Sequence, residues 1–382
     1  MPTMSDLPED LVGEILSKLP LTSLIAVRST CKNWYALSNN QVFGKGSTTR
    51  KQFLGFMLMD SRVYSMKLDL QGIHNDHEIG APSVKQVSIL GQAEITKLFH
   101  CNGLVLCVTE DKKLLLWNPY LGQTRLTRRS KTMKYLSRYD NFGLGYDNIN
   151  GYHKILRVYE REDGSLQSEI YDCNSTSWKV LGVHPEWFIT YHDSSMSVNE
   201  NTYFLALENA TKNDVWSLLC FDFTAERFGP LRPLPFQSHS HSSESVALSC
   251  VRDEKLALLY RRNYWTNMEI WITTEIDPNS VSWSKFLDVD TRSIPRFRDS
   301  YNDGTFFIDH EKKVAVLYCS LEYIPTKTCW HETAYIIGED GYSKSVVVAE
   351  TPFTSESEET WHSPVVFSSY VPSLVQLRRK RD

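Results

Sequence analysis

Residues 170–178 read Ile-Tyr-Asp-Cys-Asn-Ser-Thr-Ser-Trp, which is the end of an aromatic strand, a polar turn and the start of a returning strand. Asp172 and Asn174 are suited to close such a turn through their side chains. Aromatic residues recur in related stretches at steps of 54, 50 and 50 residues, at Trp117, Tyr171, Phe221 and Trp271. The sequence therefore predicts a structural unit that repeats about every fifty residues.

Pairs of apolar strands separated by polar turns accompany these stretches. They start at Gly103, Phe142, Met196, Val246 and Thr305. Together with the aromatic strand and its return strand, each pair makes a unit of four strands. Four strands in a repeat of about fifty residues are typical of a β-propeller blade. A β-sandwich is the structural alternative, although it does not naturally produce a repeat of this length. We expect six blades, with seven as the alternative.

Further strand-like runs flank the complete units, at residues 53–70, 85–90 and 364–377. Pairing the last run with the first ones would close the ring and remove exposed sheet edges. The predicted fold class is therefore mainly β, with a β-propeller-like domain at residues 52–377. A small all-α unit at 1–45 and a linker at 46–51 precede it, and a basic tail at 378–382 follows it.

The first forty-five residues have a helical period. Apolar residues three and four apart from Leu7 to Leu19 lie on one helical stripe, and Pro20 ends that helix. A second periodic run extends from Leu24 to Leu37. A unit of about forty residues rarely folds alone without a metal, disulfides or a partner. Its apolar side chains either pack on the rest of the chain or form a docking surface for another protein.

Several short motifs stand in a fixed order in this unit: Leu7-Pro8-Glu9-Asp10-Leu11, Ile15-Leu16, Leu19-Pro20, Leu24, Val27-Arg28, Cys31-Lys32 and Trp34. In order and spacing they resemble the F-box motif, whose helices bind a Skp-type adaptor that joins them to a cullin–RING ubiquitin ligase. The resemblance implies an adaptor-facing surface formed by Leu7, Pro8, Leu11, Ile15, Leu16, Leu19, Leu24 and Val27. It implies a role in stabilising the helical unit itself for Cys31 and Trp34.

Motifs in the β region point to the same family. They are Cys101-Asn-Gly-Leu104, Leu116-Trp-Asn-Pro119, Gly143-Leu-Gly-Tyr-Asp147 and Ser369-Tyr-Val-Pro-Ser-Leu374. Together they resemble the F-box-associated, kelch-like interaction domain common in plants. The sequence has no Gly-Gly and no Trp-Asp pair, so neither a standard kelch repeat nor a WD repeat fits. The resemblance implies the substrate-recognition subunit of a Skp–cullin–F-box ubiquitin ligase, whose β domain binds a target protein.

Composition argues against several other classes. Lys+Arg 41 against Asp+Glu 46 gives a net charge of -5, which offers no general attraction for nucleic acid or anionic membranes, so we expect neither as a partner. The start of the chain is acidic, and no apolar run approaches the length of a spanning helix. The eight cysteines form no C-x-x-C pair and are expected to be reduced thiols. We therefore expect a soluble protein of the cytoplasm, the nucleus or both.

Signals for chemistry are weak. His74-x-x-His77 and His239-Ser-His241 lack a matching set of cysteines or carboxylates, and no catalytic or nucleotide-binding fingerprint is present. We expect no metal, no cofactor and no catalytic residue. Tyr264-Trp265 and Trp187-Phe188 are either recognition anchors or, more simply, sheet-packing residues. The basic run at residues 378–381 is either a nuclear import signal or a solvated tail.

Two alternatives to a ligase subunit stay open at the level of sequence. A binding scaffold whose F-box no longer engages an adaptor predicts no adaptor binding. A propeller enzyme with a fused helical hairpin predicts a carboxylate-rich central funnel with shifted pKa values. The repeat pattern reports the scaffold and recognition loops carry specificity, so the sequence leaves the target protein unidentified.

Overall fold

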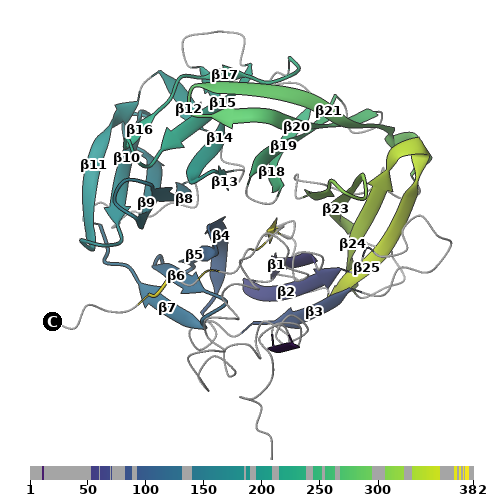
Figure 1. Ribbon diagram of the computed structural model, residues 1–382, viewed down its shortest axis with the longest axis horizontal. Coiled ribbons are helices and arrows are strands. Elements are labelled where there is room, and N and C mark those ends of the chain that lie inside the picture. The colour runs from purple at the N-terminus through teal and green to yellow at the C-terminus, as the bar shows by residue number, and fades with distance from the viewer. Residues whose placement is uncertain are drawn as a thin grey trace, which may run out of the picture.

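The computed structural model of the chain describes residues 11–12, 53–59, 61–68, 70, 82–87, 93–130, 140–184, 186–189, 195–208, 215–237, 244–251, 254–262, 267–294, 306–321, 329–352, 365–367, 370, 373 and 375–377. Within them lie the strands β1 to β26 and two short 3-10 helices, η5 (Thr291–Ser293) and η7 (Glu339–Gly341). The strands form six antiparallel sheets around a central axis (Figure 1). The fold is thus a six-bladed β-propeller.

The first three blades are described from the centre of the ring outward. Blade 1 consists of β26 (Val365–Phe367), β1 (Phe53–Met59), β2 (Arg62–Leu68) and β3 (Ser83–Gln86). Blade 2 consists of β4 (Ile95–Cys101), β5 (Leu104–Thr109), β6 (Leu114–Asn118) and β7 (Gln123–Leu126). Blade 3 consists of β8 (Asn141–Asp147), β9 (Tyr152–Glu160), β10 (Leu166–Asp172) and β11 (Ser177–His184).

The other three blades complete the ring. In blade 4, β12 (Trp187–Ile189) and β13 (Met196–Val198) share the inner position beside β14 (Asn201–Glu208), and β16 (Arg227–Phe228) and β17 (Arg232–Pro233) share the outer position beside β15 (Trp216–Asp222). Blade 5 consists of β18 (Ser245–Val251), β19 (Lys255–Arg261), β20 (Asn267–Asp277) and β21 (Ser280–Asp290). Blade 6 consists of β22 (Phe306–Asp309), β23 (Val314–Leu321), β24 (Cys329–Gly338) and β25 (Ser343–Pro352).

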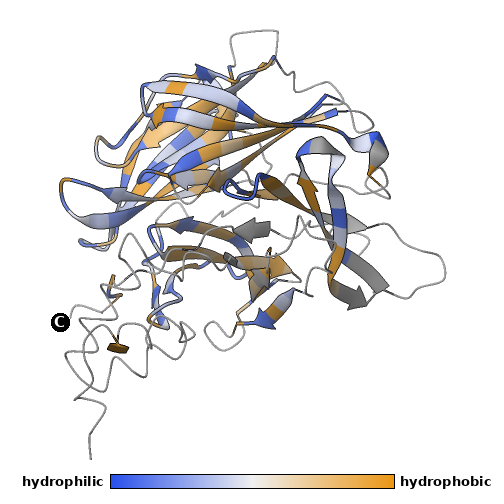
Figure 2. Ribbon diagram, turned by 45° about the vertical axis from the view of Figure 1, so that its right-hand side comes forward, coloured by the Kyte–Doolittle hydropathy of each residue, from blue (hydrophilic) through white to orange (hydrophobic). Residues whose placement is uncertain are grey.

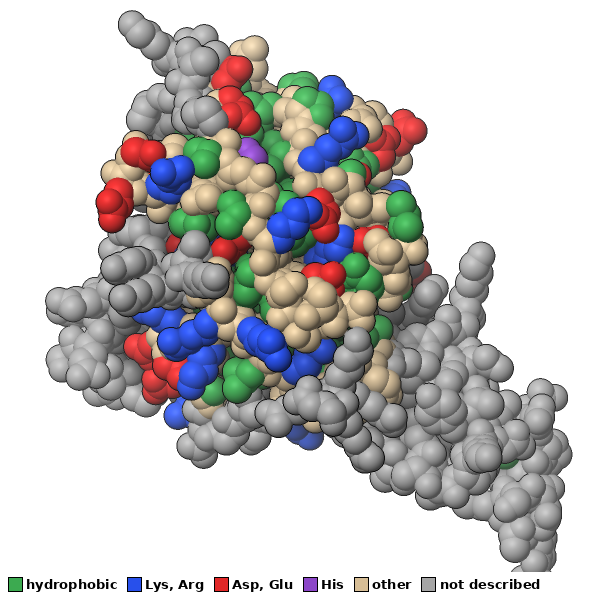
Figure 3. All heavy atoms as spheres, turned by 90° about the vertical axis from the view of Figure 1, so that its left-hand side faces the viewer, with side chains coloured by type: hydrophobic (Ala, Val, Ile, Leu, Met, Phe, Trp, Pro, Cys, Tyr) green, Lys and Arg blue, Asp and Glu red, His purple; other side chains and the backbone are tan. Residues whose placement is uncertain are grey.

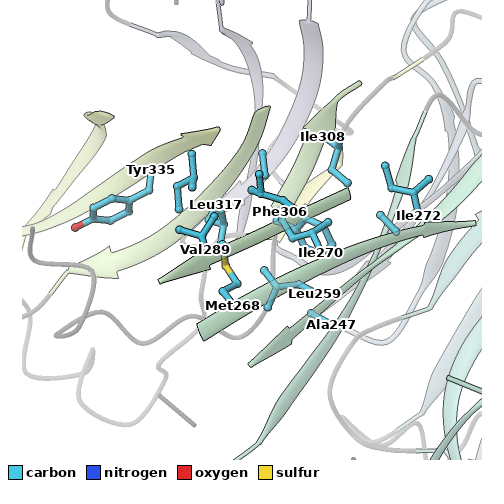
Figure 4. Packing of buried hydrophobic residues seen from close by; sticks show 14 of the residues in the cluster. Ala247, Leu259, Met268, Ile270, Ile272, Val289, Phe306, Ile308, Leu317 and Tyr335 are labelled. Atoms are coloured by element: carbon cyan, nitrogen blue, oxygen red, sulfur yellow. The ribbon is translucent and has the colours of Figure 1, made fainter. Parts of the chain in front are cut away.

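The core lies between neighbouring blades. Each of the six gaps around the ring holds one cluster of buried apolar side chains. In the gap between blades 5 and 6, Met268 and Ile270 pack with Phe306 and Leu317 (Figure 4). Strands in the middle of a blade are covered on both faces, which explains why β5 is buried along its whole length. Figure 2 shows hydrophobic residues along the strands and hydrophilic residues at many of the turns. The blades therefore hold together by face-to-face packing.

The structure confirms the predicted repeat. The aromatic residues spaced by about fifty residues all lie on the third strand of a blade, namely Trp117 on β6, Tyr171 on β10, Phe221 on β15 and Trp271 on β20. The third strand is next to the outer edge, where a large ring can span the gap between two blades. Both the seven-bladed alternative and the β-sandwich are excluded by the six sheets.

One equivalence predicted from the sequence is wrong. The pair that starts at Gly103 was expected to match the later pairs, but its strands β5 and β6 are the second and third of blade 2. In the other four pairs the strands are the first and second of their blades. The reason is that β4 already supplies the innermost strand of blade 2. The sequence of β4, Ile-Thr-Lys-Leu-Phe-His-Cys, is less apolar than that of β5. The apolar pattern therefore does not reveal β4, and it predicts β5 as the first strand of the blade.

Ring closure occurs as predicted. β26, near the end of the chain, pairs with β1, near the start of the described β domain, through residues 365–367 and 56–58. Blade 1 is therefore assembled from both ends of the β region. Such closure removes the two free edges that an open ring would leave.

Candidate interaction faces

The two ends of the ring differ in their connections. Turns between first and second strands and between third and fourth strands share one end, which we call the tight-turn face, and ten of these turns have two to four residues. The eleventh is the connection between β2 and β3, at 69–82. The opposite end, the long-connection face, carries the passages from one blade to the next, and five of these run 8 to 15 residues, at 87–94, 127–140, 234–244, 291–305 and 353–364.

Aspartates hold turns of the tight-turn face, as predicted for Asp172, whereas the Asn174 side chain makes no such bond within the described residues. Asp172 Oδ1 accepts hydrogen bonds from the backbone N–H groups of Asn174 and Ser175. The same two-bond arrangement recurs at Asp147, Asp222, Asp277 and Asp309. Side chains of this kind hold the turns without help from the rest of the fold. These five turns are accordingly preformed.

Ion pairs tie blades 3 and 4 together at the tight-turn face. Lys154 forms ion pairs with both Asp147 and Glu226. Glu226 also pairs with Lys179, at 2.7 Å between Oε2 and Nζ. Burial opposes ionisation of Asp147, but hydrogen bonds from Asn150 and Lys154 outweigh it and lower the pKa of the carboxyl to about 2. The group is therefore a structural carboxylate that is fully ionised at neutral pH.

The end of the chain crosses the tight-turn face of blade 2. Asn118 Nδ2 donates to the carbonyl oxygens of Ser373 and Val375, at 2.9 Å each. Its Oδ1 accepts from the N–H of Leu121, so one buried amide holds both its own turn and the C-terminal segment. Asn118 belongs to the Leu-Trp-Asn-Pro motif and Ser373 to the closing Ser-Tyr-Val-Pro-Ser-Leu motif. The structure thus brings together two motifs that lie 255 residues apart.

A buried ionic cluster underlies the long-connection face between blades 2 and 3. Arg157 Nε donates to Asp140 at 2.8 Å and its Nη1 donates to Glu169 at 2.8 Å. Ser130 Oγ donates to the second oxygen of Glu169, and Lys97 donates to the carbonyl of Asp140. Ser130 and Asp140 lie near the two ends of connection 127–140. The cluster therefore fixes where this connection leaves and rejoins the blades.

Sequence reasoning missed this cluster. The available signal was Arg157 itself, a single arginine in the apolar run Ile-Leu-Arg-Val of β9. A charge in such a run must find a counter-charge when the strand is buried. Its partners come from another strand and a connection, so the sequence pattern did not indicate them.

The predicted adaptor-facing residues fall almost entirely outside the described residues. Of the eight, only Leu11 is described: it is helical and 47% exposed, whereas the neighbouring Val12 is 4% exposed. Leu7, Pro8, Ile15, Leu16, Leu19, Leu24 and Val27, like Cys31 and Trp34, lie outside the described residues. Their role stays a prediction.

The two candidate aromatic anchors have different outcomes. Trp187 is buried, stacks on His184 at 4.7 Å between ring centroids, and belongs to the core between blades 3 and 4, with Phe188 packed against that core. The sheet-packing interpretation is therefore confirmed for this pair. Tyr264 and Trp265 lie outside the described residues.

The described residues give few opportunities for chemistry. They contain no group of three His, Cys, Asp or Glu side chains arranged to hold a metal ion, and both predicted histidine pairs lie outside them. The buried carboxylates Asp140, Asp147 and Glu169 are each paired with a buried cation. Burial lowers the pKa of His153 to about 4, so that the imidazole is neutral at pH 7.

The described cysteines are free thiols, and the described helices are short. Cys101, Cys107, Cys220 and Cys250 are buried free thiols, and Cys173 is a half-buried one. Burial raises the pKa of Cys173 and of Cys220 to about 12, which makes both poor nucleophiles. Within the ranges given above, no helix has the length and apolar character needed to cross a membrane.

Comparison with known proteins adds to this geometry. The F-box associated beta propeller domain family matches residues 54–377, and the F-box domain family matches residues 4–46. The chain is 51% identical to F-box protein At1g66490 of Arabidopsis thaliana, covering 99% of this chain and 100% of that protein. It is 50% identical to F-box/kelch-repeat protein At3g13680 of the same plant, covering 99% and 97%.

Among solved structures, the six-bladed fungal lectin of Aleuria aurantia matches with 9% identity and a TM-score of 0.42, covering 77% of this chain and 93% of the lectin. At that TM-score the likeness adds nothing to the six sheets described above. The two family matches, together covering both regions that the sequence separates, and the full-length relatives agree. The chain belongs to the F-box proteins that carry an F-box-associated β-propeller domain.

Proposed function

We propose that the chain is the substrate-recognition subunit of a Skp–cullin–F-box type ubiquitin ligase. The F-box match at residues 4–46 is the observation that carries this proposal. The proposed docking surface for a Skp-type adaptor consists of Leu7, Pro8, Leu11, Ile15, Leu16, Leu19, Leu24 and Val27. Leu11, the one member of this set that the structure describes, is 47% exposed, so its side chain is accessible to a partner.

The propeller is the proposed target-binding part. β1 begins at the tight-turn face, so the helical unit is connected to the ring at that end. The long-connection face lies at the opposite end, and loops of this length are where recognition residues are commonly placed on a rigid scaffold. We propose that the subunit acts by proximity, holding a target near a ubiquitin-charged enzyme and raising the effective concentration of its lysines. No catalytic group of its own is required.

The proposal also covers the division of the chain into functional units and its location in the cell. The domain boundaries at 1–45, 46–51, 52–377 and 378–382 place the adaptor and target functions on separate units. The expected location is the cytoplasm, the nucleus or both, because the adaptor and cullin partners of this family act inside the cell. Expression of a fluorescent fusion, with and without residues 378–382, would test whether the basic tail directs the chain to the nucleus.

Co-purification of the full chain with a Skp-type adaptor tests the proposal. A Leu11→Asp/Ile15→Asp variant places charges on the proposed docking stripe and should lose the adaptor. Leu126→Asp is the matched control, because Leu126 is a similarly exposed leucine, at 51%, on the outer strand of blade 2. Retention of the adaptor by the double variant, or failure of the folded wild type to bind it, would favour the scaffold or the enzyme alternative.

A further inference from the structure

The outer edge of blade 3 differs from the other outer edges. An outermost strand offers unpaired backbone N–H and C=O groups that can pair with another chain, and proteins blunt such edges by short length, charge or proline. β3 and β7 have four residues each, β16 and β17 have two each, β21 exposes Lys285, Asp288 and Asp290, and the ten-residue β25 contains Lys344, Glu350 and Pro352. β11 has eight residues, Ser177–His184. Apart from His184, its one ionisable side chain is that of Lys179.

A β-bulge gives β11 an apolar face. Trp178, Val180 and Val183 pair with every second residue of β10, from Tyr171 to Gln167, so their side chains lie on the same face of the sheet. The one extra residue that the bulge inserts between Val180 and Val183 is what brings the second valine back to this face. Val180 is 52% exposed and Val183 is 41% exposed. No other described strand carries two exposed large apolar side chains.

Gly182 lies between Val180 and Val183 in the strand but faces the other side of the sheet, because it pairs with Ser168. Gly182 follows the bulged residue, and the atom nearest to a side chain placed there would be His184 Cε1, at 3.8 Å. A glycine inside a strand often marks a place where another backbone approaches closely. The edge therefore combines the backbone groups of an outermost strand, a glycine that leaves one face bare and apolar side chains on the other face.

Positive charge borders the same face. Trp178 Nε1 donates to the backbone oxygen of Arg128 at 2.7 Å, which places the exposed Arg128 beside the row. The next residue, Arg129, is also exposed, and its Nη2 donates to the backbone oxygen of Asp111 on the blade 2 side at 3.2 Å. Glu169 is buried between Arg157 and Ser130, and Lys179 points to the opposite face, where it pairs with Glu226. Figure 3, which views this side of the ring, shows Lys and Arg side chains among hydrophobic ones, with Asp and Glu side chains interspersed. The Trp178 end of the row is accordingly bordered by arginine.

We propose that β11 is a docking edge for an extended segment of the target protein, one that carries acidic residues. The segment adds a fifth strand to blade 3, places apolar side chains on Val180 and Val183, and brings carboxylates to Arg128 and Arg129. Strand addition of this kind draws affinity from main-chain hydrogen bonds and specificity from alternate side chains. This inference rests on the proposed function, in which the propeller holds the target.

The test uses the full chain and a labelled peptide, Glu-Val-Thr-Val-Glu-Val-Thr-Glu, with its counterpart in which lysine replaces every glutamate. Fluorescence anisotropy should show about tenfold tighter binding of the acidic peptide. Hydrogen–deuterium exchange should show protection of residues 177–184 when the acidic peptide is added. Val180→Asp/Val183→Asp should weaken binding about tenfold, because it removes the apolar contacts and places carboxylates that repel the acidic peptide on the edge.

Val347→Asp is the matched control, because Val347 is 46% exposed on β25, the outer strand of blade 6, and it should leave peptide binding unchanged. Equal binding of the two peptides, absence of protection at β11, or an equal loss in the control overturns the proposal. So does a concentration-dependent dimer abolished by Val180→Asp/Val183→Asp, since the occupant would then be a second copy of the chain. The double variant should still bind the Skp-type adaptor. Failure of the wild type to bind the adaptor would count against the proposed function and not against the proposal that β11 is a docking edge.

Discussion

At the scale of single residues, the amide of Asn118 joins two distant parts of the chain. Its side chain is fully buried and makes three hydrogen bonds, one within its own turn and two to the C-terminal segment. Buried polar groups of this kind specify one arrangement because each unmade bond costs more than a made bond gains. The Leu-Trp-Asn-Pro motif is therefore explained by ring closure and not by target binding.

Asn118→Ala should lower the free energy of unfolding by about 3 kcal/mol, because it leaves the carbonyls of Ser373 and Val375 and the N–H of Leu121 without this partner. Urea denaturation of the full chain measures the change. Asn174→Ala, at an exposed turn position, is the control and should cost less than about 0.5 kcal/mol. Equal effects of the two substitutions would contradict the role given to Asn118.

The lowered pKa of Asp147 leads us to expect a specific loss of stability in acid. Its pKa of about 2 in the folded protein lies below the ordinary 3.8, so its contribution to stability is present above about pH 4 and is lost as the pH falls toward 2. That contribution is about 2 kcal/mol. Asp147→Asn should therefore lose less stability than the wild type between about pH 4 and pH 2.5.

Asp290 provides the comparison for this acid response. Its pKa is also lowered to about 2, chiefly by hydrogen bonds from Arg292, but both side chains of this pair are exposed to solvent. Solvent screens an exposed pair, so Asp290→Asn should change the acid dependence much less than Asp147→Asn. Urea midpoints measured across this pH range distinguish the two. Parallel curves for the wild type and Asp147→Asn would show that the buried ion pair does not set the acid stability.

At the scale of elements, close packing between blades depends on small residues in the inner strands. Gly145 lies on β8 against Phe223, whose ring belongs to the turn between β15 and β16 of blade 4. A side chain at Gly145 would overlap that ring, and Phe223 is fully buried in the core between blades 3 and 4. The Gly-Leu-Gly-Tyr-Asp motif of the sequence is therefore a packing requirement at the contact of two blades.

Gly145→Ala should destabilise the fold by about 3 kcal/mol, since a methyl group has no room there and the neighbouring blade must shift. Gly182→Ala is the control, because the nearest atom to its added methyl group is 3.8 Å away. Thermal unfolding of both variants compares the two sites. A tolerated Gly145→Ala would indicate that blades 3 and 4 pack less tightly than described.

Elements were predictable to different degrees. The third-strand aromatics and the aspartate turns have local sequence signals, so their period and their turn chemistry were correctly predicted. The bulge in β11 has no local signal, because it arises from the pairing with β10 and shifts Val183 to the face of Val180. The ion cluster around Arg157 was missed for a similar reason, since its partners meet only when blades 2 and 3 are side by side.

At the scale of the whole molecule, the ring is closed twice by the end of the chain. β26 pairs with β1, and residues beyond it pack on blade 2, where Tyr370 and Leu377 join the cores on either side of that blade. The sequence predicted the first closure from unpaired strands at both ends of the repeat region. It could not predict the second, which depends on hydrogen bonds between backbone carbonyls and a side chain 255 residues away.

Deleting residues 370–382 should destabilise the propeller strongly, by several times the cost of Asn118→Ala, because two core side chains and the bonds to Asn118 are lost together. Deleting residues 378–382 alone is the control and should leave the unfolding temperature nearly unchanged. Calorimetry on both truncated chains measures the difference. Similar unfolding temperatures would show that the segment past β26 is dispensable for the ring.

The central claim is that one chain joins a target-holding propeller to a ubiquitin ligase. The most direct measurement reconstitutes the full chain with a Skp-type adaptor, a cullin–RING module and a ubiquitin-charged enzyme, and follows ubiquitin transfer to the chain itself. The account predicts conjugates that require the adaptor and that disappear with Leu11→Asp/Ile15→Asp but persist with Leu126→Asp. Conjugates formed equally without the adaptor, or none with a folded wild-type chain that binds it, would contradict the account.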